Sequence, residues 1–250
     1  MKCLRFPRFL AAMAISAMLF TAWAVAKETP ADVATTPAPR PDDWWKQRQQ
    51  AVNARVKQGH VDLVFLGDSI TEGWGKNAAW KKHFEPLKAA NFGIGGDRTE
   101  HVLWRIENGE LDGVTPKAIV LLIGTNNLPA NTTYTANTVE ETFNGVKAIV
   151  DKLKEKEPQA HILLLAVFPR EDKPLTDKIA ELNGMIAKLD DGKQVKFLNI
   201  NDKFVDSDGK LLPGVMGRDK LHPAAKGYDL WAEAIRPTLT EWLGPQAAGK

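Results

Sequence analysis

The chain has 250 residues, of which 44% are hydrophobic, and its 33 Lys and Arg residues nearly balance 31 Asp and Glu residues, for a formal net charge of +2. This size fits one large globular domain, and the charge balance argues against a basic surface for nucleic acid or an anionic membrane. Cys3 is the only cysteine, which excludes an internal disulfide.

The first 26 residues have the pattern of a cleavable export signal. Three basic residues within the first eight positions precede an apolar stretch at 9–22, and Ala24-Val25-Ala26 is a small-residue cleavage site. Removal of residues 1–26 takes Cys3 away, leaves 30 basic and 31 acidic residues, and places the mature protein in the periplasm or outside the cell. An uncleaved membrane anchor is the alternative, although the apolar stretch is short for a bilayer span.

Residues 27–43 are rich in Pro, Ala and Thr, a composition typical of an extended, disordered linker. Trp44 and Trp45 then begin a polar helix that extends to about Gly59. We expect this tryptophan pair to dock onto the domain, with a platform for a ligand as the alternative. The domain itself is expected over residues 44–245.

From Val61 onward, apolar runs rich in β-branched residues alternate with helical patterns, and the chain shows no internal repeat. Strands that are buried on both faces and separated by helices are typical of a parallel sheet with right-handed crossovers. The strands are predicted at 61–66, 88–92 (a weaker pattern), 118–123, 161–167 and 195–200, and the helices near 77–84, 98–108, 135–157, 174–190 and 224–243.

Ser69 follows the first of these strands directly, in the run Leu66-Gly67-Asp68-Ser69. Its hydroxyl is therefore expected at the carboxyl end of a buried strand, where open α/β sheets bind ligands. Past the export signal, Ser207 is the only other serine. Gly-Asp-Ser taken alone also fits an ordinary turn, so a catalytic role requires a base that activates the hydroxyl.

His222 is the candidate base, because it precedes the last helix and has Asp219 three residues before it. A carboxylate at that spacing can accept a hydrogen bond from the imidazole Nδ1–H, although Asp219 can also serve as a helix cap. His101 is a second candidate, expected at the rim of the cleft. The other histidines are expected away from it: His60 and His161 at the opposite edge of the sheet, and His83 on an exposed helix.

Two loops at strand ends can donate hydrogen bonds to a developing oxyanion. Residues 91–97 contain three glycines and open a helix with unpaired N–H groups, and residues 123–127 present the Asn126 amide. A dinucleotide phosphate loop is the alternative for residues 91–97. However, Gly-x-Gly-Gly lacks the full fingerprint, and no acidic residue follows at the required distance.

Four short segments of the chain resemble, in order, the sequence blocks of the SGNH (GDSL-type) hydrolases. They are Gly67-Asp68-Ser69, Gly96, Gly124-Thr125-Asn126 and Asp219-x-x-His222. Two longer runs look like the catalytic subunits of intracellular platelet-activating factor acetylhydrolase: NFGIGGDRTEHVLWRIENGEL and PKAIVLLIGTNN. The resemblance extends from about Val61 to Leu243, and it leaves out the export signal and the Pro-rich segment.

The resemblance implies an α/β fold, a flavodoxin-like three-layer α/β/α sandwich with a parallel five-stranded sheet. It also implies that Ser69 is the nucleophile, His222 the base and Asp219 the group that orients His222. The oxyanion hole would consist of the Ser69 and Gly96 backbone N–H groups and the Asn126 side chain. On this resemblance the protein needs no metal and no cofactor.

We therefore expect an exported serine esterase that hydrolyses small acyl esters, acetyl esters above all. The alcohol is a glycan, lipid or aryl group, and export favours an acetylated carbohydrate. Trp74 and Trp104 flank the two loops and are candidates for the wall of the acyl pocket, with core packing as their alternative. The sequence does not decide the oligomeric state, and a homodimer is one possibility.

Three other functions fit the same blocks. One is a lysophospholipase, thioesterase or platelet-activating factor acetylhydrolase-like lipid esterase, and another is an acyltransferase that uses the same acyl-enzyme. The third is a non-catalytic glycan-binding module that has kept the fold.

Overall fold

The computed structural model describes residues 33–129 and 133–248, and the predicted export signal and residues 27–32 lie outside this part. One sheet holds five strands in the order β2-β1-β3-β4-β5, and every pairing is parallel. This is the flavodoxin-like strand order, so the predicted fold class is confirmed. The strands are β1 (Leu63–Gly67), β2 (Ala89–Gly93), β3 (Ala118–Leu122), β4 (His161–Leu165) and β5 (Val195–Leu198).

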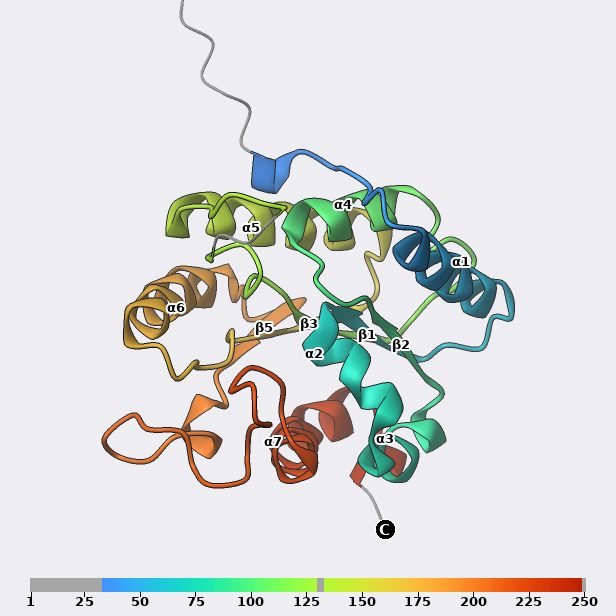
Figure 1. Ribbon diagram of the computed structural model, residues 1–250. Helices are drawn as coiled ribbons and strands as arrows, with labels where there is room; N and C mark the ends of the chain where they lie inside the picture. The colour runs from blue at the N-terminus through green and yellow to red at the C-terminus, as the bar shows by residue number, and fades with distance from the viewer. Residues whose placement is uncertain (1–32, 130–132, 249–250) are drawn as a thin grey trace, which may run out of the picture. The chain divides into compact units, whose positions relative to one another are not determined.

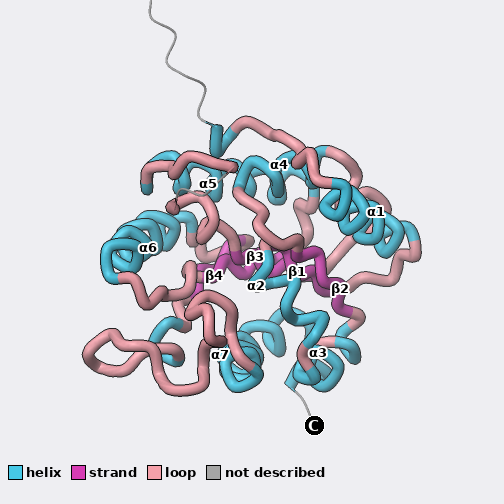
Figure 2. Tube along the Cα trace, viewed as in Figure 1, coloured by secondary structure: helices cyan, strands magenta, loops and turns pink. Residues whose placement is uncertain are grey.

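Helices cover both faces of the sheet, which gives the domain three layers (Figures 1 and 2). One face carries α1 (Asp43–Lys57), α4 (Thr99–Glu107), α5 (Val139–Lys156) and α6 (Lys173–Ile186). The other face carries α2 (Ser69–Glu72), α3 (Ala78–His83) and α7 (Ala225–Leu243). Among the described residues, no helix has both the length and the apolar character that a membrane span requires.

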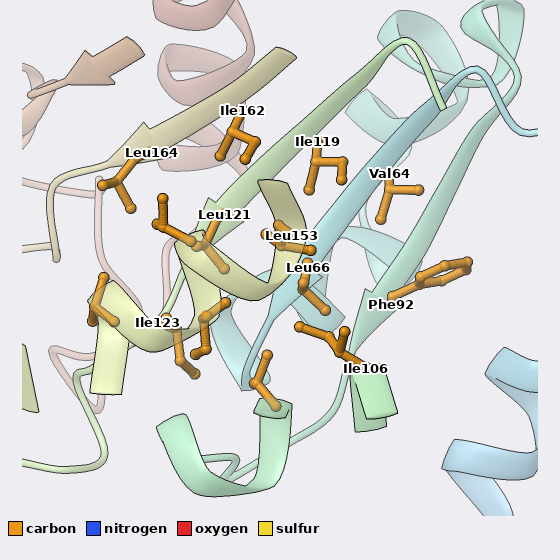
Figure 3. Close-up of a cluster of buried hydrophobic side chains, with 14 of the residues drawn as sticks. Val64, Leu66, Phe92, Ile106, Ile119, Leu121, Ile123, Leu153, Ile162 and Leu164 are labelled. Atoms are coloured by element: carbon orange, nitrogen blue, oxygen red, sulfur yellow. The ribbon is translucent and has the colours of Figure 1, made fainter. Parts of the chain in front are cut away.

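Successive side chains of a strand point to opposite faces of the sheet, so each strand contributes to two hydrophobic cores, one on each face. In β1, Val64 and Leu66 belong to the core beneath α4 and α5, whereas Leu63 and Phe65 belong to the core beneath α7. Figure 3 shows the first of these cores, where Val64 and Leu66 lie near the side chains of neighbouring strands. A strand that is buried on both faces has apolar residues at successive positions, and this explains why the apolar run at 61–66 predicted β1.

The register of the sheet aligns the ends of three strands. Gly67 at the end of β1 is paired with Gly93 of β2 on one side and with Leu122 of β3 on the other. Because the strands are parallel, the loops that follow them emerge at the same edge of the sheet. The Gly-Asp-Ser turn, the glycine loop at 94–98 and the loop at 123–127 are thereby brought together.

Residues 33–42, which we call the N-terminal strap, pack against the domain, in contrast to the disordered linker that their composition predicts. Ala34 has no exposed surface, and its carbonyl oxygen accepts a hydrogen bond from Thr99 Oγ1 at 2.8 Å. The Ala38 N–H donates to the Glu100 carbonyl at 3.2 Å. The strap is ordered because its backbone groups find partners on α4.

The tryptophan pair at the start of α1 divides into one buried and one exposed ring. Trp45 is 1% exposed and lies 5.5 Å from Trp104 between ring centroids, whereas Trp44 is 49% exposed. The expected docking of the pair therefore holds for Trp45 and not for Trp44.

Candidate active site

The turn after β1 presents Ser69 at the edge of the sheet. Gly67 is required there, because a side chain at this position would collide with the Leu122 carbonyl oxygen of β3. The buried Asp68 carboxylate then accepts a hydrogen bond from the Ile70 N–H at 2.9 Å, which begins α2 with Ser69 as its first residue.

Ser69, His222 and Asp219 form a connected chain of hydrogen bonds. His222 Nε2 lies 2.8 Å from Ser69 Oγ, and His222 Nδ1 lies 2.6 Å from Asp219 Oδ2. The other oxygen of Asp219 accepts hydrogen bonds from the Leu221 and His222 backbone N–H groups, each at 3.0 Å. Asp219 therefore fixes both the loop before α7 and the direction of the imidazole, so that Nε2 faces the serine.

Asp219 stays ionised at any pH near neutrality. Burial raises the pKa of this carboxyl, but hydrogen bonds from the His222 ring and from the His222 and Leu221 backbone outweigh burial and lower the pKa to about 2. An ionised carboxylate at Nδ1 holds the imidazole tautomer whose Nε2 can accept the serine proton.

The structure places His101 inside the protein, so its prediction as a second base at the cleft rim is wrong. His101 is 1% exposed, and its Nδ1 accepts a hydrogen bond from the Arg98 N–H at 3.0 Å at the start of α4. Burial and the cationic Arg40, Arg98 and Arg105 lower its pKa to about 3, which keeps the ring neutral.

The remaining histidines serve other contacts. His161 begins β4, at the sheet edge opposite Ser69, and stacks on Trp242 with 4.7 Å between ring centroids. His83 ends α3, where its Nδ1 lies 3.3 Å from an Arg236 guanidinium nitrogen. His60 precedes β1 in the left-handed conformation, with φ of 54°.

The glycine loop lies directly against the serine. A side chain built on Gly95 would approach Ser69 Cβ to 3.8 Å, and the Gly95 N–H donates to Glu72 Oε2 at 2.8 Å. Gly96 has φ of +72°, in the left-handed region that favours glycine. In the described part of the chain, the backbone N–H groups of Ser69 and Gly96 have no hydrogen-bond acceptor within the protein.

Asn126 reaches the same place from the loop after β3. Its Nδ2 donates to the Asp97 carbonyl at 2.8 Å and lies 3.4 Å from Asp68 Oδ2. The amide has two N–H groups, and the longer contact leaves the second weakly engaged. Asn126 thus links the glycine loop to the turn at Asp68 and Ser69 while it retains a donor for a ligand.

A buried charge network supports these loops from below, and the sequence prediction missed it. Asp97 accepts hydrogen bonds from Trp45 Nε1 at 2.6 Å and pairs with Arg105 Nε at 2.8 Å. Arg105 also pairs with Glu110 and donates to the Gly67 carbonyl at 3.2 Å. Arg105 stands between apolar residues of α4, and an arginine within the run 102–106 was the available signal.

Burial in this network raises the pKa of several carboxyl groups. The pKa of Asp68 rises to about 7, because burial and the nearby Asp97 outweigh the hydrogen bond from Ile70 and the more distant Arg105 and Arg170. Burial likewise raises the pKa of Asp97, against the opposing effect of Arg105. The buried region around Asp68 and Asp97, next to Ser69, therefore has a low dielectric constant, and a hydrogen bond there is electrostatically strong.

A cavity of about 500 Å³ opens beside Ser69. Trp74 and Trp104 do not line it. Trp74 has no exposed surface and packs 4.6 Å from Tyr228 and 4.9 Å from Trp231, and Trp104 packs on Trp45 at α1. The cavity is lined by Ser69, Glu72, Gly73, Lys76, Asn77, His222, Pro223, Ala225 and Tyr228.

The arrangement fits acyl transfer. A hydroxyl faces an imidazole that a carboxylate orients, and backbone N–H donors with no acceptor within the protein lie nearby. Within residues 33–129 and 133–248, no group of three or more His, Cys, Asp or Glu residues is placed to hold a metal.

The chain is similar to a known protein family and to characterised proteins. A model of the GDSL-like lipase/acylhydrolase family matches residues 65–230. The alpha2 subunit of platelet-activating factor acetylhydrolase IB from Rattus norvegicus is 40% identical over 205 residues, which are 81% of this chain and 86% of that protein. The alpha1 subunit from Homo sapiens is 37% identical over 205 residues, 81% of this chain and 85% of that protein.

Solved structures share the fold. A GDSL-like lipase from Bacteroides thetaiotaomicron superposes with a TM-score of 0.64 at 25% identity, over 78% of this chain and 97% of that chain. A catalytic mutant of an acetylxylan esterase from Geobacillus stearothermophilus superposes with a TM-score of 0.57 at 17% identity, over 75% and 96%. At the lower identity the likeness concerns the fold alone.

Proposed function

The chain belongs to the GDSL-like lipase/acylhydrolase family, and we propose that within it the protein is an exported serine esterase that hydrolyses small acyl esters, acetyl esters above all. The observation that carries this proposal is the hydrogen-bond chain from Ser69 through His222 to Asp219, with distances of 2.8 and 2.6 Å. Export rests on the signal-like pattern of residues 1–26.

In the first half of the reaction, Ser69 Oγ attacks the ester carbonyl carbon while His222 Nε2 accepts the serine proton. The negative charge that develops on the carbonyl oxygen is stabilised by the Ser69 and Gly96 N–H groups and by the Asn126 amide. His222 then donates its proton to the oxygen of the leaving alcohol, the bond from the carbonyl carbon to that oxygen breaks, and the acyl group remains on Ser69.

In the second half, water replaces the alcohol. His222 Nε2 accepts a proton from this water, whose oxygen attacks the acyl carbon on Ser69 and forms a second oxyanion in the same place. Breakdown of that intermediate returns the proton from His222 to Ser69 Oγ and releases the carboxylic acid. Asp219 stabilises the imidazolium in both halves and remains ionised throughout.

Two observations favour a short acyl group and a polar alcohol. The curated relatives are acetylhydrolases by name, which supports an acetyl ester. The cavity beside Ser69 is lined by the polar side chains of Glu72, Lys76 and Asn77, which suit a hydroxyl-rich alcohol such as a sugar better than a long apolar chain.

A lipid acetyl ester is the second candidate, and it rests on the 40% identity to the platelet-activating factor acetylhydrolase subunit. On this alternative the acyl group is the same, and the leaving alcohol belongs to a phospholipid. The two candidates therefore differ in the alcohol and agree on Ser69.

The test is a panel of p-nitrophenyl acetate, butyrate and octanoate, an acetylated xylooligosaccharide and a phospholipid acetyl ester, assayed with the wild type and Ser69→Ala. We expect acetate to be hydrolysed faster than octanoate, with the acetylated sugar preferred to the phospholipid, and Ser69→Ala to lose on the order of 10⁶ in kcat. A wild type that prefers octanoate would replace the acetylesterase proposal with a lysophospholipase. Activity that survives in Ser69→Ala would remove the nucleophile assignment.

A further inference from the structure

Arg40 of the N-terminal strap reaches the glycine loop beside Ser69. Its Nη1 donates to the Gly95 carbonyl oxygen at 2.9 Å, across 55 residues of sequence. Asp42 holds the same guanidinium through contacts at 3.0 and 3.1 Å, and the Trp44 ring lies 4.9 Å from its central carbon. Only 13% of the Arg40 side chain is exposed, so its charge acts with little screening by solvent.

The carbonyl that Arg40 binds belongs to the same peptide group as the Gly96 N–H. A peptide group is planar and trans, so its C=O and N–H point in opposite directions. A bond that fixes the direction of the Gly95 carbonyl therefore fixes the direction of the Gly96 N–H. Glu72 holds the preceding peptide group in the same way, through the Gly95 N–H at 2.8 Å.

This clamp acts on a segment that would otherwise be loose. Gly95 and Gly96 carry no side chains, and glycine populates many backbone conformations at little cost. A side chain at Gly96 would meet Arg40 Nη1 at 2.6 Å, which shows how closely the guanidinium lies against the loop. An oxyanion donor is effective only when its direction is fixed before the reaction, because no energy is then needed to reorient it.

The charge of Arg40 adds to the effect of its position. A cation that hydrogen-bonds a carbonyl draws electron density toward the oxygen and makes the N–H of the same amide a stronger donor. This polarisation reaches the oxyanion through the Gly96 N–H.

We propose that Arg40 is a positioning residue of the oxyanion hole, which clamps and polarises the Gly95–Gly96 peptide group so that the Gly96 N–H faces the reacting carbonyl oxygen. The inference rests on the proposed function of Ser69, because it concerns a donor used by that reaction. It also assigns the N-terminal strap a part in catalysis through another residue, with no contact of its own to substrate.

The test compares Arg40→Gln, Arg40→Lys and the wild type in steady-state hydrolysis of p-nitrophenyl acetate. We expect Arg40→Gln to lower kcat about tenfold, less than the ~10²–10³ that follows removal of a whole donor, with KM within about twofold of the wild type. Arg40→Lys keeps the charge and should recover part of kcat. The matched control is Arg55→Gln, because Arg55 also donates to a backbone carbonyl, that of Gly59 at 2.8 Å, but at the far end of α1.

Several outcomes would overturn the inference. Unchanged kcat in Arg40→Gln, or a rise in KM with kcat retained, would make Arg40 a strap anchor or a substrate contact. An equal loss in Arg55→Gln would indicate general damage to the fold. If Arg40→Gln does not fold, Asp42→Ala carries the test: it leaves the guanidinium but removes the acceptor that anchors it, and an unchanged kcat would then reject the clamp.

The same assay separates this inference from the proposed function. A wild type without Ser69-dependent ester hydrolysis would reject the proposed function itself. A wild type whose hydrolysis depends on Ser69, together with unchanged kcat in Arg40→Gln, would reject only the role of Arg40.

Discussion

At the scale of single residues, His222 and His101 show how surroundings decide between two similar side chains. Both precede or begin a helix, and both lie near predicted loops of the site. His222 faces Ser69 Oγ with an ionised carboxylate behind it, whereas His101 is buried, neutral and bonded to a backbone N–H. Only the first can take a proton from the serine.

Replacement of each histidine by alanine separates these roles. His222→Ala should lower kcat nearly as far as loss of the serine, on the order of 10⁶, because the two groups act as one unit. His101→Ala should keep kcat within about tenfold and instead lower the free energy of unfolding, since the buried Arg98 N–H loses its acceptor. Steady-state kinetics and urea unfolding measure both effects, and equal loss of kcat in the two variants would reject His222 as the base.

Asn126 has a structural contact and a proposed transition-state contact, and kinetics can distinguish them. Asn126→Ala should lower kcat by roughly 10²–10³ and leave KM nearly unchanged, because the amide serves charge that is present only in the transition state. The measurement is kcat and KM for p-nitrophenyl acetate. If KM rises while kcat stays constant, Asn126 binds the substrate and does not stabilise the oxyanion.

The site residues were predictable to different degrees for a physical reason. Ser69, Asp219 and His222 stand next to strand ends and a helix start, so the order of elements alone brings them to one sheet edge. Trp74 is close to Ser69 in sequence, but sequence does not give the direction of a side chain, and the ring points into the core beneath α7. Arg40 could not be found, because its partner Gly95 lies 55 residues away.

At the scale of elements, the strands and long helices agree with the periodic patterns of the sequence to within a few residues. The N-terminal strap differs, because a composition rich in Pro, Ala and Thr reports a lack of regular structure and cannot report tertiary contacts. The start of α1 shows the same limit: Trp44 and Trp45 are adjacent and chemically identical, yet only Trp45 is buried, with its Nε1 bonded to Asp97.

The two tryptophans form a matched pair for testing how α1 is attached. Trp45→Phe should lower the free energy of unfolding by about 1–3 kcal/mol, because the buried Asp97 carboxylate loses a donor while most of the ring packing remains. Trp44→Phe, at a half-exposed position, should change it by less than about 0.5 kcal/mol. Urea unfolding of both variants gives the comparison, and similar values would contradict the docking of α1 through Trp45.

At the scale of the whole molecule, buried carboxylates make stability depend on pH. Burial raises the pKa of Asp68 to about 7, above the ordinary value of 3.8, so the folded protein binds more protons than the unfolded chain between these values. The contribution of Asp68 to stability is therefore full below about pH 4 and is lost as pH rises toward 7. Asp191 acts in the opposite sense, because hydrogen bonds from Lys154 and the Val195 N–H lower its pKa.

Urea unfolding at several pH values tests this dependence. Between pH 4 and pH 8, Asp68→Asn should gain stability relative to the wild type, by on the order of 2–4 kcal/mol, since each unit of pKa corresponds to about 1.4 kcal/mol. Asp191→Asn is the control of opposite sign: relative to the wild type it should lose stability as pH rises from 2 to 5. Parallel profiles for the wild type and Asp68→Asn would show that folding does not raise the pKa of Asp68.

Formation of a covalent intermediate on Ser69 is tested by intact-protein mass spectrometry after incubation with a fluorophosphonate. The wild type should gain one phosphonyl group, peptide mapping should place it on Ser69, and Ser69→Ala and His222→Ala should remain unmodified under the same conditions. A wild type that hydrolyses acetyl esters yet stays unmodified, or a modification of equal extent in Ser69→Ala, would contradict the account.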